Sequence, residues 1–262
     1  MDDDRSPKTV LKRERVRAFL LALVEDRRPG DAIPSERTLS AELGVSRPTL
    51  RAAVDELVAT GQLVREHGRG MFVAPAKITQ ELVAESHPAA APRAPGAWAS
   101  QVLEFRTITA GARIGRRLRI SPAAELVYVA RLRLVDGSPI ALEYLHIPAA
   151  LVPGLTPQQM ERGFYAHLRE ERGVATAQAV QSIEPTVLSE DEAELLGVPV
   201  LSPALLFDRV TSDGAGRPVE YVRSLYRGDR YRIVSRLALG PTADDRPAPD
   251  VSRTASWWGT VE

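Results

Sequence analysis

Residues 34–73 constrain the fold of this chain more than any other stretch. The run PSERTLSAELGVSRPTLRAAVDELVATGQLVREHGRGMFV contains two short helical patterns, a tight turn and a glycine-rich hairpin. Ser35 and Ser46 stand where helix N-caps belong, because a serine hydroxyl accepts a hydrogen bond from an orphan amide of the first turn. Gly44 provides a stop between the two helices. The pattern therefore predicts a helix–turn–helix followed by a hairpin.

The second of these helices has an apolar face and a polar N-terminal end. Leu50, Val54 and Leu57 recur at i, i+4 and i+7, the spacing of a helix with one buried face. Its start carries polar and basic residues instead, namely Arg47, Thr49 and Arg51. A recognition helix enters the major groove by that end, and the arginine fork matches two acceptors of guanine. The sequence therefore predicts contact with double-stranded DNA.

The hairpin, residues 62–73, has His67, Gly68, Arg69 and Gly70 at its tip. A glycine-rich tip lets the backbone approach phosphate closely, and an arginine there can enter the minor groove. Any one of these arginines could equally be a solvated surface charge, and the stretch could be an ordinary helical hairpin. The combination of caps, turn, basic helix end and hairpin favours a DNA-binding winged helix.

This stretch resembles the DNA-binding module of the GntR family of bacterial transcription regulators. The resemblance covers most of residues 8–74 and implies a winged helix–turn–helix domain over residues 8–76, whose first helix we expect at residues 9–27. It also implies a homodimer. It implies operator-DNA contacts for Arg37, Ser46, Arg47, Thr49, Arg51, His67, Gly68, Arg69 and Gly70.

Composition sets wide bounds on function. A chain of 262 residues is too long for a winged helix alone, so we expect about two domains. Zero cysteines exclude disulfides and thiol catalysis and fit a reducing cytoplasm. No apolar run is long enough to span a membrane, and the acidic N-terminus lacks the apolar segment of a signal peptide. Because the net charge is +0, DNA binding has to depend on where the arginines lie.

The remaining residues divide into a linker, a second domain and a tail. Residues 77–96 are expected to be a linker, because proline and alanine dominate much of this stretch. Residues 97–240 carry strand patterns interrupted by two helical ones, at 156–172 and 189–197, which predicts an α+β domain with a mostly antiparallel sheet. The tail, residues 241–262, is polar and expected to be disordered.

One face of the predicted sheet collects charged side chains. Arg131 and Arg133 share a face of their strand, and neighbouring arginines repel unless something negative lies between them. A three-residue loop after this strand places Glu143 opposite Arg131, whereas two or four residues place it on the other face. Glu220 and Tyr226 share a face of a later strand. The set fits either solvated cross-strand ion pairs, each worth under ~1 kcal/mol, or a pocket in which arginines hold an anion.

Residues 96–240 resemble the UTRA effector domain of the HutC subfamily of GntR regulators, whose fold is similar to chorismate lyase. The matching stretches are ARLRLVDGSPIALEYLHIP and DRVTSDGAGRPVEYVRSLYRGDRYRIVSRL. The resemblance implies ligand-binding roles for Arg131, Arg133, Glu143, Glu220 and Tyr226. Members that bind phosphorylated sugars tend to have Ser-x-Tyr at a helix start, where this chain has residues 163–165, Gly-Phe-Tyr. The missing hydroxyl favours a carboxylate or a larger apolar ligand over a sugar phosphate.

We therefore expect a ligand-responsive repressor that binds operator DNA as a dimer and is released by a small anionic effector. No cofactor, metal or catalytic residue is expected. One alternative is a lyase-like enzyme, although the four histidines are scattered and no nucleotide loop, metal-ligand spacing or nucleophile elbow is present. The other is a constitutive DNA-binding protein whose second domain only dimerises.

Overall fold

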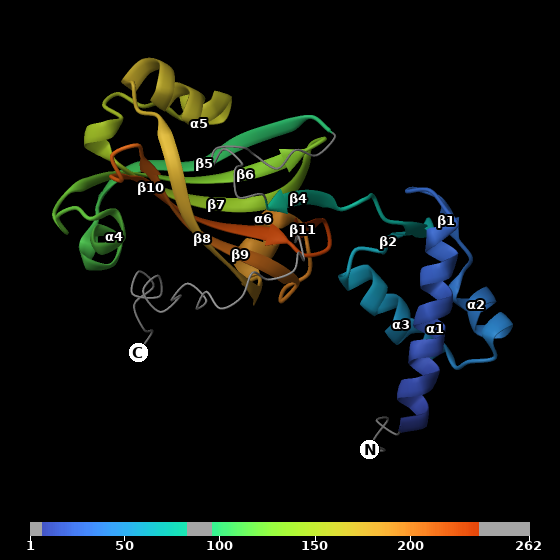
Figure 1. The fold of residues 1–262 in the computed structure, drawn as a ribbon. Helices are drawn as coiled ribbons and strands as arrows, with labels where there is room; N and C mark the ends of the chain where they lie inside the picture. The colour runs from blue at the N-terminus through green and yellow to red at the C-terminus, as the bar shows by residue number, and fades with distance from the viewer. Residues whose placement is uncertain (1–6, 83–95, 236–262) are drawn as a thin grey trace, which may run out of the picture.

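The computed structural model describes residues 7–82 and 96–235, which form two units (Figure 1). The first unit contains α1 (Pro7–Glu25), β1 (Ala32–Ile33), α2 (Glu36–Leu43), α3 (Arg47–Ala59), β2 (Leu63–Glu66) and β3 (Gly70–Val73). Its strands form an antiparallel sheet in the order β1-β3-β2. This unit is the predicted winged helix–turn–helix, and the β2–β3 hairpin is its wing.

Local chemistry explains where the helices of this unit begin and end. The Ser35 hydroxyl accepts a hydrogen bond from the Thr38 amide at 3.2 Å, and the Ser46 hydroxyl accepts one from the Thr49 amide at 3.4 Å. Gly44 ends α2 at a φ of 62°, a left-handed conformation that costs glycine little. The predicted caps are therefore confirmed.

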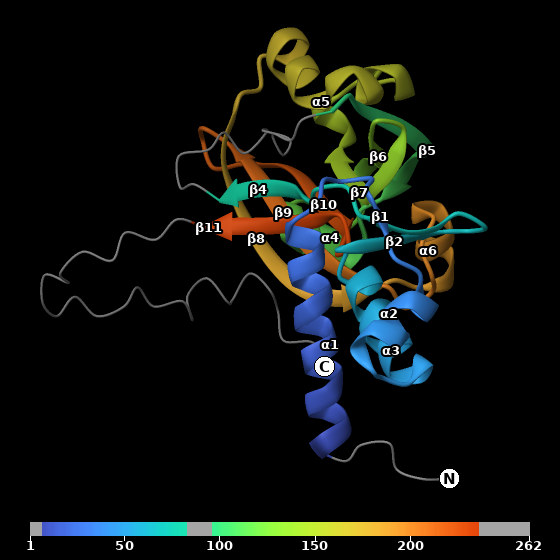
Figure 2. The same ribbon diagram turned by 90° about the vertical axis from the view of Figure 1, so that its right-hand side faces the viewer.

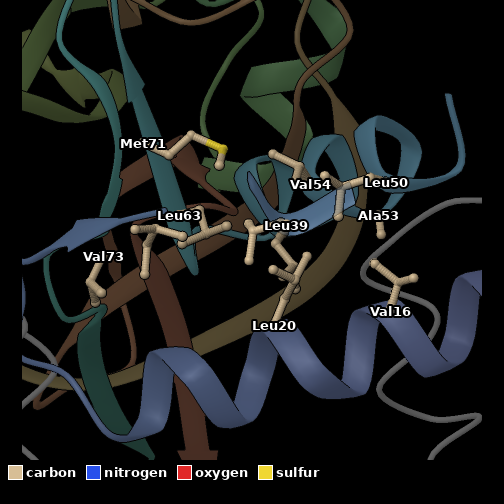
Figure 3. Packing of buried hydrophobic residues seen from close by; sticks show 11 residues of the cluster. Val16, Leu20, Leu39, Leu50, Ala53, Val54, Leu63, Met71 and Val73 are labelled. Atoms are coloured by element: carbon tan, nitrogen blue, oxygen red, sulfur yellow. The ribbon is translucent and has the colours of Figure 1, made fainter. Parts of the chain in front are cut away.

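One apolar core holds α1 behind the helix–turn–helix (Figure 3). Leu20 of α1 and Leu50 of α3 are completely buried, and Leu39 of α2 packs with them. Each buried leucine contributes about 1.5–3 kcal/mol relative to an exposed one. This core fixes the direction in which α3 presents its N-terminal end.

The second unit is built on an antiparallel sheet of six strands in the order β5-β6-β7-β10-β9-β8. These strands are β5 (Trp98–Thr109), β6 (Glu125–Val135), β7 (Ser138–Pro148), β8 (Thr176–Val187), β9 (Pro203–Asp213) and β10 (Pro218–Arg227). Helix α5 (Pro157–Arg172) covers one face of the sheet, while α4 (Gly111–Leu118) and α6 (Glu190–Leu196) pack on the other. The α+β class with a mostly antiparallel sheet is confirmed, and α4 is an addition to the predicted elements.

The boundary between the units differs from the prediction. Residues 78–82 form β4 (Ile78–Leu82), which pairs in parallel with β11 (Tyr231–Ser235) beside the sheet (Figure 2). Ile78 is buried among residues of the second unit. The predicted linker 77–96 is therefore wrong at its start, because β4 belongs to the second unit and residues 74–77 make the connection.

The other predicted flexible segments lie outside the described residues. These are the rest of the linker up to residue 95 and the tail 241–262. Within the part of the chain that is described, no helix is both long and apolar enough to cross a membrane.

The β6–β7 hairpin decides which charged residues meet. Its turn has two residues, Asp136 and Gly137, at φ 49° and 75°, as a type I′ turn requires. Of the loop lengths that we considered, the two-residue one is therefore present. A bulge that leaves Ile140 unpaired shifts the register by one residue, so Arg131 does pair with Glu143. The pairing that we expected only from a three-residue loop thus arises from a two-residue turn and a bulge.

Candidate DNA-binding surface and effector cavity

The N-terminal end of α3 and the tip of the wing present basic residues to solvent. Arg37 and Arg47 are exposed, and the side chain of Arg51 is 67% exposed. Thr49 is half-buried, and its hydroxyl lies 2.8 Å from that of Ser46 inside the N-cap. The tip of the wing is also exposed and consists of His67, Gly68, Arg69 and Gly70. Both of its glycines have a positive φ.

Carboxylates of the same unit orient several of these arginines. Glu36 accepts hydrogen bonds from Arg51 at 3.3 Å and from Arg65 at 2.8 Å. Arg69 pairs with Glu66 at the wing tip. Exposed pairs of this kind contribute under ~1 kcal/mol, so a phosphate group can take over the arginine at little cost. The arginine side chains are thus oriented by weak ion pairs that DNA phosphates can replace.

A cavity of about 340 Å³ lies between α5 and the sheet of the second unit. Four of the five predicted effector residues line it: Arg131, Arg133, Glu143 and Tyr226. Glu220 is completely buried and is absent from the cavity wall, so its prediction as a direct ligand contact is corrected. Further polar and aromatic lining residues escaped the sequence reasoning, among them Gln80, Trp98, Ser100, Tyr165, Gln181 and Arg209.

Arg131 and Glu143 form a buried ion pair on the cavity wall. The Arg131 Nε donates to Glu143 Oε2 at 2.7 Å, and its Nη1 donates to the Met160 carbonyl oxygen at 3.2 Å. Burial acts to raise the pKa of Glu143, but the charges of Arg131 and Arg133 more than offset it, so that pKa lies below its usual value. The carboxylate is therefore ionised, and it neutralises Arg131 from within the protein.

Arg133 is a half-buried arginine on the cavity wall. Its Nη1 donates to the Ser100 hydroxyl at 3.0 Å, and its guanidinium lies 5.4 Å from the ring centroid of Trp98. The described residues place no carboxylate within salt-bridge distance of it. A half-buried guanidinium in this state is suited to an anionic ligand group.

Tyr165 links the cavity to Glu220. Its hydroxyl donates to Glu220 Oε1 and accepts a hydrogen bond from Arg209 at 2.8 Å. Burial, and then the charge of Glu220, raise the pKa of Tyr165 well above its ordinary value, so the phenol stays protonated. Glu220 therefore acts on the cavity through Tyr165 and Arg209.

A kink in α5 positions this tyrosine. Gly163 has φ 144° and ψ 91°, which are not helical values, and it separates α5 into two parts. The second part begins with Phe164, which is buried in the core under α5, and with Tyr165, which lines the cavity. Only glycine adopts such a backbone conformation without strain.

The side chains of the cavity are arranged for ligand binding more than for catalysis. Arg131, Glu143 and Arg209 are committed to other protein groups, Arg133 and the exposed Arg162 are left for a ligand, and much of the remaining wall is aromatic or amide in character. Among the residues described, no three His, Cys, Asp or Glu side chains lie together as a metal ion would require. A polar cavity of this kind holds a small ligand by a few fixed contacts.

A winged helix with a basic recognition end, joined to a unit with a cation-lined cavity, defines a ligand-responsive DNA-binding regulator. Comparison with known families supports this class. Residues 13–73 match the gntR family of bacterial regulatory proteins, and residues 95–232 match the UTRA domain. The chain therefore belongs to the GntR family of bacterial transcription regulators, in the HutC group that carries a UTRA domain.

Individual relatives agree in sequence and in structure. The transcriptional repressor PhnF of Mycolicibacterium smegmatis is 35% identical over 223 residues, which are 84% of this chain and 90% of the relative. The repressor NagR of Bacillus subtilis is 31% identical over 207 residues, 79% of this chain and 85% of the relative. The crystal structure of PhnF from Mycobacterium smegmatis superposes with a TM-score of 0.59 at 31% identity, covering 86% of this chain and all of that chain.

Proposed function

We propose that this protein is a cytoplasmic repressor that binds operator DNA as a homodimer and releases it when an anionic effector enters the cavity. The nine predicted residues make the DNA contacts: Arg37 on α2, four residues at the start of α3 and four on the wing. Two copies place their recognition helices in successive major grooves of a roughly palindromic site. The repressors among the relatives support this direction of control.

The effector part of the proposal rests on the surroundings of Arg133. A half-buried guanidinium with only a hydroxyl as hydrogen-bond acceptor gains most from an added carboxylate or phosphate group. The neighbouring aromatic rings of Trp98 and Tyr226 favour a ligand that also has an apolar part. One relative is named as the repressor of a mannosyl-D-glycerate transport and metabolism system and another as a histidine utilization repressor, so carboxylate-bearing compounds head the panel to be tested.

The test begins with a DNA duplex that the wild-type protein itself selects from a randomised pool. Gel-shift titrations then measure its affinity with and without D-glycerate, mannosyl-D-glycerate, histidine, citrate, glucose 6-phosphate and inorganic phosphate. A compound that binds the cavity raises the melting temperature by mass action. We expect the same compound to weaken duplex binding. A compound that stabilises the protein and strengthens duplex binding would overturn the proposed direction of control.

A further inference from the structure

Strand β4 both enters the second unit and contributes a residue to the cavity. Gln80 lines the cavity, and its Oε1 accepts a hydrogen bond from the Tyr231 hydroxyl of β11. Residues 74–77 alone separate β4 from the wing strand β3. The cavity is thus one short connection away from the DNA-binding unit.

Several contacts tie β4 firmly to the second unit. The Ile78 amide donates to the Arg230 carbonyl oxygen at 2.8 Å, and Lys77 Nζ donates to the Gly228 carbonyl oxygen at 2.7 Å. Ile78 packs in a cluster with Tyr231 and with the cavity residue Tyr226. We therefore expect a displacement of the cavity wall at Tyr226 to move β4 as well.

The turn between β10 and β11 reaches the first unit directly. Asp229 in this turn is held by Arg227, whose Nη2 donates to it at 2.6 Å. The backbone of Asp229 packs against Gly61, just beyond the end of α3. The same turn follows Tyr226, so two routes run from the cavity to the DNA-binding unit: β4 leads to the wing strand β3, and this turn reaches the end of the recognition helix.

We propose that Gln80 is an effector contact and the residue through which cavity occupancy reaches the winged helix. This inference rests on the proposed function. Because Tyr231 engages the Gln80 oxygen, the amide NH₂ is left to donate to an oxygen of the ligand. A ligand that draws the amide toward itself weakens the Gln80–Tyr231 contact, shifts β4 against β11 and, through residues 74–77, changes how the two winged helices of a dimer are presented.

The test compares Gln80→Met with Gln101→Met. Both substitutions replace a strand glutamine by a side chain of nearly the same length, but Gln101 is exposed on β5 and is not part of the cavity wall. The probe is the panel compound that most raises the melting temperature of the wild type. At saturation we expect it to lower duplex affinity at least fivefold in the wild type and in Gln101→Met. In Gln80→Met the compound should still raise the melting temperature, yet lower duplex affinity less than twofold.

If the compound lowers duplex affinity in Gln80→Met by the same factor as in the wild type, the inference is overturned while the proposed function stays intact. If the wild type itself shows no release, the proposed function fails, and amide hydrogen exchange without ligand decides the inference. Exchange over residues 59–82 should then be about tenfold faster in Gln80→Met than in the wild type and unchanged in Gln101→Met. Equal rates in all three proteins would show that Gln80 does not tie the cavity to the winged helix.

Discussion

The backbone carbonyl of Asp229 occupies the space where a β-carbon on Gly61 would lie. Gly61 follows the recognition helix, and Asp229 lies in the turn between β10 and β11, so this close approach joins the two units. Gly61 also has φ +71°. A glycine is therefore required here for two separate reasons, and they can be measured apart.

Gly61→Ala should destabilise the protein more than Gly44→Ala does. Gly44 has a similar φ of +62° but open space where a β-carbon would go. Its replacement should cost about 1–2 kcal/mol, the penalty of a left-handed alanine. Gly61→Ala pays the same penalty and must also push the Asp229 turn away, which should at least double the loss. Urea unfolding followed by circular dichroism measures both, and equal losses would show that the units do not touch at this point.

The Arg131–Glu143 pair gives a second prediction. Glu143→Leu should lower the free energy of unfolding by about 3–5 kcal/mol, because it leaves a buried guanidinium without its counter-charge. Replacing both members, Arg131→Met with Glu143→Leu, removes the unpaired charge and should restore most of the loss. A double-mutant cycle from chemical unfolding tests this. Additive losses would contradict a coupled buried pair.

The winged helix could be predicted from the sequence because its signals are local. Ser35 and Ser46 sit next to the helices they cap, and the caps can be read without knowing the tertiary structure. Helix α4 escaped because Ala110 at its start makes no side-chain cap bond. Strand β4 escaped because its partner β11 lies about 150 residues away and nothing local marks the pairing.

The cavity was recovered in part for a similar reason. Arg131, Arg133 and Glu143 come from one hairpin, so alternation along two adjacent strands nearly suffices to group them. Arg209 joins them only through the register of β9 against β10, in which it stands opposite Val222. Tyr165 depends on the backbone kink at Gly163, which no periodicity predicts.

His146 should make the stability of the protein depend on pH in the acidic range. Burial, and then the charge of Arg113, lower the pKa of His146 to about 4. The unfolded chain has the ordinary value of 6.5, so it binds more protons than the folded chain between these values, and stability falls as the pH drops from about 6.5 to about 4. His146→Phe should flatten that part of the curve of melting temperature against pH, and Arg113→Gln should make it shallower. A curve identical in His146→Phe and the wild type would contradict the prediction.

Arg47→Ala tests the DNA-binding end of α3. Because the substitution removes a base contact, it should weaken the free energy of specific duplex binding by about 1–3 kcal/mol. Arg217→Ala is the matched control, because this exposed arginine pairs with Asp213 in the second unit, away from the winged helix. Duplex binding should be unaffected in Arg217→Ala, and melting temperatures should confirm that both variants fold. Equal affinity of Arg47→Ala and the wild type would remove Arg47 from the interface.

Arg133→Ala separates the two functions of the chain. The winged helix keeps its own core, so duplex affinity without effector should stay within about twofold of the wild type. The effector should lose a charge-assisted hydrogen bond, worth about 1.5–3 kcal/mol, so about ten- to a hundredfold more compound should be needed to raise the melting temperature or to release the duplex. Arg162→Ala serves as the control, since this side chain lines the same cavity but is exposed to solvent, where screening weakens its hold on an anion. An effector response that survives unchanged in Arg133→Ala and disappears in Arg162→Ala would move the anion site from the sheet to the kinked helix α5.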